Sequence, residues 1–144
     1  MSVIISGVYC DDIRMEFGNK VSLMGCYADN LLFPAFPARL PKLCLHFRID
    51  ISGDDSTNIE SIAITTYRDG DSLSTNNFKI EERGEASEHS ISGGFFIENL
   101  EFTGPSIITA SALVDYIRSG ERFQEEILGP TLKVLNIGAQ SPTG

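Results

Sequence analysis

The side chains that most often carry covalent chemistry are scarce in this chain. Its 144 residues include two histidines, His46 and His89, and no G-x-S-x-G elbow that would present a nucleophilic serine. Nucleophilic catalysis needs a serine or cysteine, a base and an orienting acid that converge. The P-loop, the G-x-G-x-x-G turn and the H-E-x-x-H helix are also absent from the sequence. We therefore predict no catalytic residue and no cofactor.

Two clusters of acidic residues are the most ligand-like groups in the sequence. Asp11, Asp12 and Glu16 form the first cluster, and Asp54 and Asp55 form the second. Calcium takes several oxygens from one loop, often in a D-x-D-x-D-G pattern, which neither cluster has. Solvated turn acids and salt-bridge partners are the favoured interpretation, and we predict no metal site.

A charged segment and a pair of aromatic residues are candidates for partner recognition. Arg14 with Asp12 or Glu16 can form a polar brace at one end of the fold, or a patch that recognises a partner. Phe33 and Phe36 are flanked by prolines and are candidate interface aromatics, with core packing as the alternative. The predicted partner-binding residues are Asp11, Asp12, Arg14, Glu16, Phe33 and Phe36.

The cysteines and the N-terminal stretch indicate a reducing compartment. Cys10, Cys26 and Cys44 lie in apolar runs without C-x-x-C spacing, which is typical of small buried side chains and not of a disulfide framework or a zinc site. The N-terminal stretch has no basic region, and no apolar stretch approaches the roughly 18 residues of a membrane span. We expect a cytoplasmic protein.

The clearest structural signal is the strand expected from Lys42 to Ile51. Its apolar residues alternate strictly with polar ones, which puts one set on a core face and the other towards water. Other strands are expected at 3–10, 20–28, 59–68, around 78–80, and at 94–102, 108–116, 122–128 and 131–137.

The breaks between these strands follow turn residues. We expect one short helical turn within Asp11–Asn19, an extended crossing over Pro34–Pro41, and an exposed loop over Glu81–Gly93. Further turns are expected at Ser52–Asn58, at Asp69-Gly70, at Gly104-Pro105 and at Arg118–Glu121, with a bulge or break at Gly129-Pro130.

About eight strands with regularly spaced turns, and no amphipathic helix, predict an all-β fold. We favour a two-sheet antiparallel β-sandwich of immunoglobulin-like arrangement over a small barrel. The predicted domain spans 1–138, and residues 139–144 form a flexible C-terminal tail.

The formal net charge of −9 argues against binding to nucleic acid or to an anionic membrane. Keeping the protein soluble is the simplest role for this charge. The alternative is an acidic inhibitor or decoy that binds a basic surface of a nucleic-acid-processing complex.

The segment Tyr9–Tyr27, followed by Leu40–Leu43, resembles a family of small, uncharacterised bacterial all-β proteins. The shared pattern is C-D-D-I-R-x-E, then G-x-K-x-S-L-x-G-x-Y, then a proline-rich piece and a strand. The likeness covers residues 3–51 well and the later half loosely. It implies a compact cytoplasmic β domain, and it supplies no activity, cofactor or catalytic residue.

Taken together, these observations favour a non-enzymatic protein-binding or assembly module. Its open sheet edges could recruit a protein partner or a second copy of the chain. The acidic decoy is the alternative, and a small hydrolase or carbohydrate-binding sandwich is a second alternative.

Overall fold

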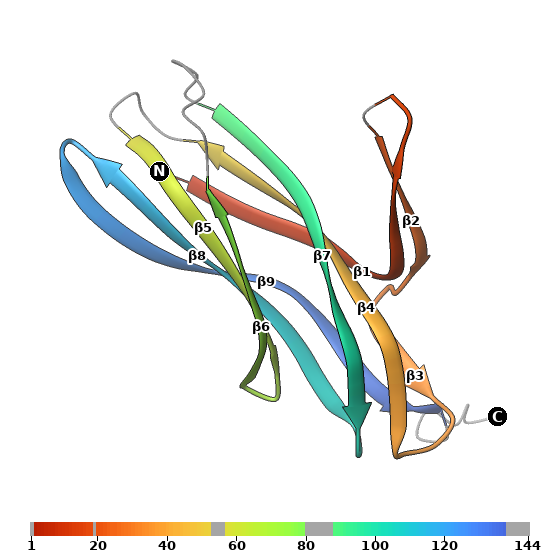
Figure 1. Ribbon diagram of the computed structural model, residues 1–144. Coiled ribbons are helices and arrows are strands. Elements are labelled where there is room, and N and C mark those ends of the chain that lie inside the picture. The colour runs from red at the N-terminus through yellow and green to blue at the C-terminus, as the bar shows by residue number, and fades with distance from the viewer. Residues whose placement is uncertain (1, 19, 53–56, 80–87, 138–144) are drawn as a thin grey trace.

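Two β-sheets packed face to face make up the computed structural model, which describes residues 2–18, 20–52, 57–79 and 88–137 (Figure 1). Sheet A has four strands in the order β2-β1-β4-β7, and sheet B has five in the order β3-β9-β8-β5-β6. The strands are β1 (Ser2–Glu16), β2 (Lys20–Cys26), β3 (Asn30–Phe33), β4 (Ala38–Ser52), β5 (Thr57–Arg68), β6 (Asp71–Lys79), β7 (Glu88–Phe102), β8 (Ser106–Arg118) and β9 (Glu121–Asn136). The predicted all-β sandwich is confirmed. Its pairing is antiparallel except between β3 and β9, which run parallel.

The core between the sheets follows from the alternation in β4. Leu43, Leu45, Phe47, Ile49 and Ile51 are all buried, as the period of two predicts. They pack against the inward residues of sheet B, which include Ile62, Ile64, Ile108, Ala112, Val114, Leu132 and Val134. On the opposite side of β4, Arg48 is exposed but Cys44 is buried. Another part of the chain therefore covers this outer side of sheet A.

The predicted turns at the hairpins of sheet B are confirmed. Asp69 and Gly70 have φ angles of 49° and 88°, and Ser119 and Gly120 have φ angles of 51° and 80°. Two consecutive positive φ angles match the twist of the flanking strands in a two-residue hairpin. The register of β8 and β9 shifts where Gly129 and Pro130 lie opposite Ala110, which confirms the predicted bulge.

The expected helical turn within Asp11–Asn19 is wrong. Asp11–Glu16 continues β1 and pairs with β2, from Asp12 opposite Met24 to Glu16 opposite Lys20. The turn occupies Phe17 and Gly18, and Asn19 lies outside the described residues. The cross-strand pairing satisfies the backbone groups that a helical turn would have satisfied locally.

The proline-rich crossing is shorter than expected, because β4 already begins at Ala38. Pro41 therefore lies inside a strand. It is tolerated because β1 pairs with β4 only from Cys44 onwards, which leaves one side of β4 open at Pro41. Pro41 and Asn99, which has a φ of 55°, interrupt the register with β7. Leu43 lies on one side of this interruption, and Leu100 and Phe102 lie on the other, yet all three are buried. The alternation of buried and exposed residues therefore shifts by one position there.

Three other expectations meet the limits of the described residues. The loop predicted over Glu81–Gly93 is wrong from Glu88 onwards, because β7 starts there, and residues 80–87 lie outside the description. The turn expected over Ser52–Asn58 and the tail expected at 139–144 also fall mostly or wholly on residues that are not described. Residues Thr57 and Asn58 belong to β5.

Candidate functional surface: the β1–β2 arm

The second half of β1 and its partner β2 form a hairpin that projects beyond the rest of sheet A. The register of β1 with β4 ends at Cys10 opposite Cys44, whereas its register with β2 continues to Glu16 opposite Lys20. Residues 11–18 and 20–26, called the arm below, stand away from the two packed sheets (Figure 1). The arm is therefore a two-stranded ribbon that is anchored at one end only.

The bend at the root of the arm depends on Gly25. Its φ is 63°, and a Cβ atom placed there would lie 2.2 Å from Oδ2 of Asp11. The Asp11 side chain lies over this glycine and accepts a hydrogen bond from the Tyr27 hydroxyl. Burial first, and then this hydrogen bond, raise the pKa of Tyr27. A residue with a side chain at position 25 would strain the backbone and collide with Asp11.

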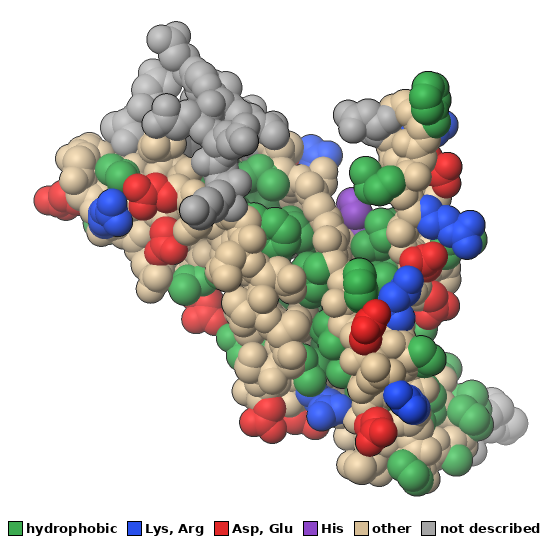
Figure 2. Space-filling model, viewed as in Figure 1, with side chains coloured by type: hydrophobic (Ala, Val, Ile, Leu, Met, Phe, Trp, Pro, Cys, Tyr) green, Lys and Arg blue, Asp and Glu red, His purple; other side chains and the backbone are tan. Residues whose placement is uncertain are grey.

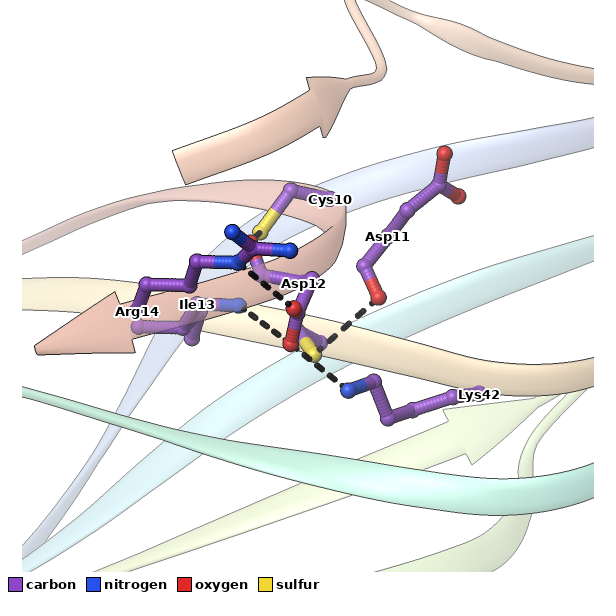
Figure 3. A network of polar contacts seen from close by, with 7 residues as sticks. Cys10, Asp11, Asp12, Ile13, Arg14 and Lys42 are labelled. Carbon is purple, nitrogen blue, oxygen red and sulfur yellow. Dashed lines mark hydrogen bonds and ion pairs between the residues drawn. The ribbon is translucent and has the colours of Figure 1, made fainter. Parts of the chain in front are cut away.

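The carboxylate of Asp12 joins the arm to β4 (Figure 3). Oδ1 accepts from Nζ of Lys42 at 2.6 Å and from the backbone N–H of Ile13 at 3.0 Å, and Oδ2 lies 3.4 Å from Nε of Arg14. The Lys42 hydrogen bond is the main cause that lowers the pKa of Asp12, and the same bond raises the pKa of Lys42. Asp12 is thus the centre of a polar brace at the root of the arm.

The ammonium of Lys42 also lies over an aromatic ring. Its Nζ atom is 5.7 Å from the ring centroid of Phe96 on β7, a distance typical of a cation–π contact. Lys42 therefore connects the arm, through Asp12, to the edge strand of sheet A.

Two buried thiols lie beneath the brace. The Cys10 thiol donates to the carbonyl of Asp12 at 3.5 Å, and the Cys44 thiol donates to the carbonyl of Asp11 at 3.6 Å. Burial raises the pKa of Cys10 to about 11 and also raises the pKa of Cys44. Both thiols remain protonated at neutral pH and pack as small apolar groups, as the sequence indicated. Cys26, which lies opposite Cys10, is exposed, so the prediction of a buried side chain is wrong for this cysteine.

The arm has one apolar face. Ile13 lies opposite Leu23, and Met15 lies opposite Val21, so the four side chains share a face of the ribbon. At the root this face turns towards sheet A, because a Cβ atom on Gly94 would lie 2.6 Å from Cδ1 of Ile13. Towards the tip, sheet A no longer covers this face.

The tip of the arm is the most exposed apolar part of the arm. Phe17, in the turn, is 99% exposed, and Met15 is 77% exposed. Val21 and Met24 on β2 are also exposed.

The outer face of sheet A opposite the arm is also partly apolar. It carries Ile4 and Val8 on β1 and Phe96 on β7, all exposed, and Val8 lies beside His46 in the register of β1 and β4. Figure 2 shows a hollow between the arm and the body of the molecule, with hydrophobic side chains on both sides of it. The arm and this face flank the hollow, whose sides are partly apolar.

Four of the six residues predicted to bind a partner come together on the arm. Asp11 and Asp12 lie at its root, and Arg14 and Glu16 lie towards its tip. The brace that the sequence suggested is present between Arg14 and Asp12, and its strongest contact is made with Lys42.

Phe33 and Phe36 lie elsewhere: Phe33 ends β3, and Phe36 lies between β3 and β4. The Phe33 ring centroid is 6.0 Å from that of Phe36 and 5.5 Å from that of Phe102, which is buried. Both rings pack against the core, the alternative that the sequence left open. We leave them out of the candidate surface.

Sequence reasoning missed the apolar residues of the arm and the role of Lys42. The signal that could have found the tip is Phe17-Gly18, a turn sequence that carries a hydrophobic side chain where turns usually carry polar ones. No comparable signal exists for Lys42, which is 30 positions from Asp12.

Within the described residues, the cluster of Asp11, Asp12 and Glu16 does not form a cation site. Among the described residues, no group of three or more His, Cys, Asp or Glu side chains is arranged to hold a metal ion. The second cluster, Asp54 and Asp55, lies outside those residues. In the described part of the chain, no helix has the length and hydropathy needed to cross a membrane.

A model of one protein family matches residues 6–118, more than three quarters of the chain. The chain belongs to the family of unknown function DUF6941. Membership of an uncharacterised family is what the resemblance led us to expect. The region matched to DUF6941 contains the whole arm and its anchor residue Lys42. No curated protein and no solved structure matches the chain.

Proposed function

We propose that this protein is a protein-binding or assembly module that engages its partner through the arm. The observation that carries the proposal is the exposure of Phe17 and Met15, 99% and 77%, at the end of a ribbon that stands clear of the core. Single exposed apolar side chains are ordinary, but a cluster of them on a projecting element is typical of an interaction site.

The arm is also held in position before a partner arrives. The Asp12–Lys42 ion pair and the Asp11–Tyr27 hydrogen bond fix its root. An ordered binding element loses less conformational entropy on association than a flexible one. The brace therefore supports binding even though its residues need not touch the partner.

The proposal is tested by affinity capture of the full chain from the native cell. The variant Met15→Ser/Phe17→Ser removes the apolar tip, and Leu128→Ser, at an 81% exposed residue of β9, is the matched control. We expect the captured complex to be retained by Leu128→Ser and lost by the arm variant. Capture by both variants alike would contradict the proposal.

Salt distinguishes this proposal from the acidic decoy. An interface built on apolar side chains persists at high ionic strength, whereas attraction between a chain of charge −9 and a basic surface is screened. We expect the complex to survive from about 0.1 M to 1 M salt, a range over which the screening length falls about threefold. A complex that dissociates as the salt concentration rises, and that still forms with the arm variant, would favour the acidic decoy.

A further inference from the structure

The three cysteines of the chain lie side by side on three adjacent strands of sheet A. Cys10 of β1 lies opposite Cys26 of β2 on one side and opposite Cys44 of β4 on the other. Directly opposite residues of an antiparallel pair point to the same face of the sheet. Since Leu43 and Leu45 of β4 face the core, the three cysteine side chains share the outer face. They therefore form one cluster at the root of the arm.

A backbone hydrogen bond beside this row distinguishes the two cysteine pairs. The N–H of Tyr27 donates to the carbonyl of Tyr9 at 2.8 Å, and this bond flanks the pair of Cys10 and Cys26. Because hydrogen-bonded and non-hydrogen-bonded pairs alternate along an antiparallel ladder, Cys10 and Cys26 are a non-hydrogen-bonded pair. The N–H and the carbonyl of Cys10 then point towards β4, so Cys10 and Cys44 are a hydrogen-bonded pair.

The two kinds of pair differ in how easily they are joined by a disulfide. The two Cβ atoms of a disulfide lie about 3.5–4.5 Å apart. The Cβ atoms of directly opposite residues are about 4.5–5.5 Å apart, and the shorter separations belong to non-hydrogen-bonded pairs. The register therefore favours a bond from Cys10 to Cys26 over one from Cys10 to Cys44.

Cys26 and Cys10 also differ in their access to solvent. Cys26 is exposed, whereas Cys10 is buried. Burial is the main cause that raises the pKa of Cys10 to about 11, and the neighbouring thiols of Cys44 and Cys26 add to this effect. An oxidant in solution therefore reaches Cys26 first. A solvent-accessible thiol beside a second cysteine is the usual arrangement where a reversible disulfide forms.

We propose that Cys26 and Cys10 are a redox-sensitive pair, in which Cys26 reacts with a peroxide and Cys10 then closes a reversible disulfide between β2 and β1. The inference goes beyond the proposed function, because the reaction needs no protein partner. It gives no part to Cys44, whose thiol is buried and donates to the carbonyl of Asp11 at 3.6 Å.

The reaction takes place in two steps. In the first, the Cys26 thiolate attacks one oxygen of hydrogen peroxide and the O–O bond breaks, which leaves a sulfenic acid on Cys26 and a hydroxide that takes up a proton to become water. In the second, the sulfur of Cys10 attacks the sulfur of Cys26, the S–O bond breaks, and the departing hydroxide leaves as water with the Cys10 proton. The two thiols lose two electrons, and the peroxide is reduced to two molecules of water.

The high pKa of Cys10 is compatible with its role in the second step. A protonated thiol is protected from direct attack by the oxidant. Its reaction with the sulfenic acid of Cys26 is intramolecular, so a high effective concentration offsets the small fraction of thiolate. The new bond would replace the contact of the Cys10 thiol with the carbonyl of Asp12 and would tie β2 to β1 at the root of the arm.

The test uses the purified, reduced full chain, treated at neutral pH with a small molar excess of hydrogen peroxide. The remaining thiols are blocked with an alkylating reagent, and the protein is digested without reduction and analysed by mass spectrometry. We expect two peptides joined through Cys10 and Cys26, which dithiothreitol separates again.

Three substitutions assign the roles of the cysteines. Cys26→Ser should abolish the disulfide. Cys10→Ala should leave a sulfenic acid on Cys26, which dimedone labels. Cys44→Ala is the matched control, because Cys44 also lies opposite Cys10, and it should form the disulfide as the wild type does. If Cys10→Ala does not fold, the wild-type peptide map and Cys26→Ser still decide the outcome.

A disulfide between Cys10 and Cys44, or one that joins two chains through Cys26, would overturn the inference. So would oxidation of Cys26 to a sulfinic or sulfonic acid with no disulfide. The arm variant Met15→Ser/Phe17→Ser keeps all three cysteines and should form the disulfide normally. The redox pair and the proposed function therefore fail separately.

Discussion

The carboxylate of Asp12 lies 2.6 Å from the ammonium of Lys42, and this contact joins two parts of the chain that diverge immediately afterwards. At Cys10 and Cys44 the strands β1 and β4 are still paired. Two residues on, β1 has entered the arm while β4 continues along sheet A. The ion pair closes the fork between them and, together with Gly25, helps to hold the arm in its orientation.

The brace should depend on pH through Asp12. Because the pKa of Asp12 in the folded chain is below its ordinary value of 3.8, the contact stabilises the fold above that value and is lost as the pH falls through the lowered pKa. The raised pKa of Lys42 means that its contribution is lost only as the pH rises beyond 10.5. Between these limits the brace is intact.

We expect the wild type to be more stable than Asp12→Asn at neutral pH, with the difference shrinking below pH 4, near the ordinary pKa of aspartate. Chemical denaturation of both proteins across this range measures the difference. A gap that is constant down to the acid limit would show that the charge of Asp12 does not contribute.

Gly25 should be intolerant of substitution although it is exposed. Gly25→Ala introduces a Cβ atom 2.2 Å from the Asp11 carboxylate at a φ of 63°, so we expect the Asp11–Tyr27 hydrogen bond to break and the arm to become mobile. Hydrogen exchange of the β2 amides should accelerate, while that of the core strands is unchanged. The control is Gly18→Ala in the turn, which meets nothing within 4 Å but has the same sign of φ. Equal effects of the two variants would contradict a special role for the Asp11 contact.

The sequence was sufficient where a segment is buried on one side. In β4 the core imposes a period of two, so that Leu43, Phe47 and Ile49 could be assigned to the interior directly. The hairpin turns could be predicted for a related reason. Positive φ angles at Gly70 and Gly120 are favourable for glycine, and this preference is visible in the sequence.

The strand at 20–28 was predicted and forms one half of the arm, but the half from Asp11 to Glu16 was not, because neither of its faces is fully buried. Asp11–Glu16 has solvent on one side and the hollow on the other, so its polar residues obey no core-driven alternation and suggested a turn. The contact between Asp12 and Lys42 depends on the sharp departure of β1 from β4, which local propensities do not encode. The packing of Phe33 on Phe102 likewise depends on how β3 crosses to sheet B.

The three thiols should differ in reactivity. Cys26 is exposed, whereas Cys10 and Cys44 are buried, and burial raises the pKa of Cys10 to about 11. Since the thiolate is the reactive species, we expect an alkylating reagent at neutral pH to modify Cys26 first. Mass spectrometry of the folded protein should show one rapid addition, and Cys26→Ser should abolish it. Rapid addition at Cys10 would mean that the root of the arm opens readily.

Two phenylalanines of the same strand-rich chain should respond in opposite ways to truncation. Phe47 is 1% exposed and its ring centroid is 5.1 Å from that of Phe78, whereas Phe17 is 99% exposed. Phe47→Ala leaves a cavity between the sheets and should lower the free energy of unfolding by about 3–5 kcal/mol. Phe17→Ala removes no packing, so its effect should stay within about 0.5 kcal/mol while partner capture is lost. Equilibrium denaturation and the capture assay measure the two quantities. If Phe17→Ala destabilised the fold as Phe47→Ala does, the tip would be part of the core and the arm would lose its role as a binding element.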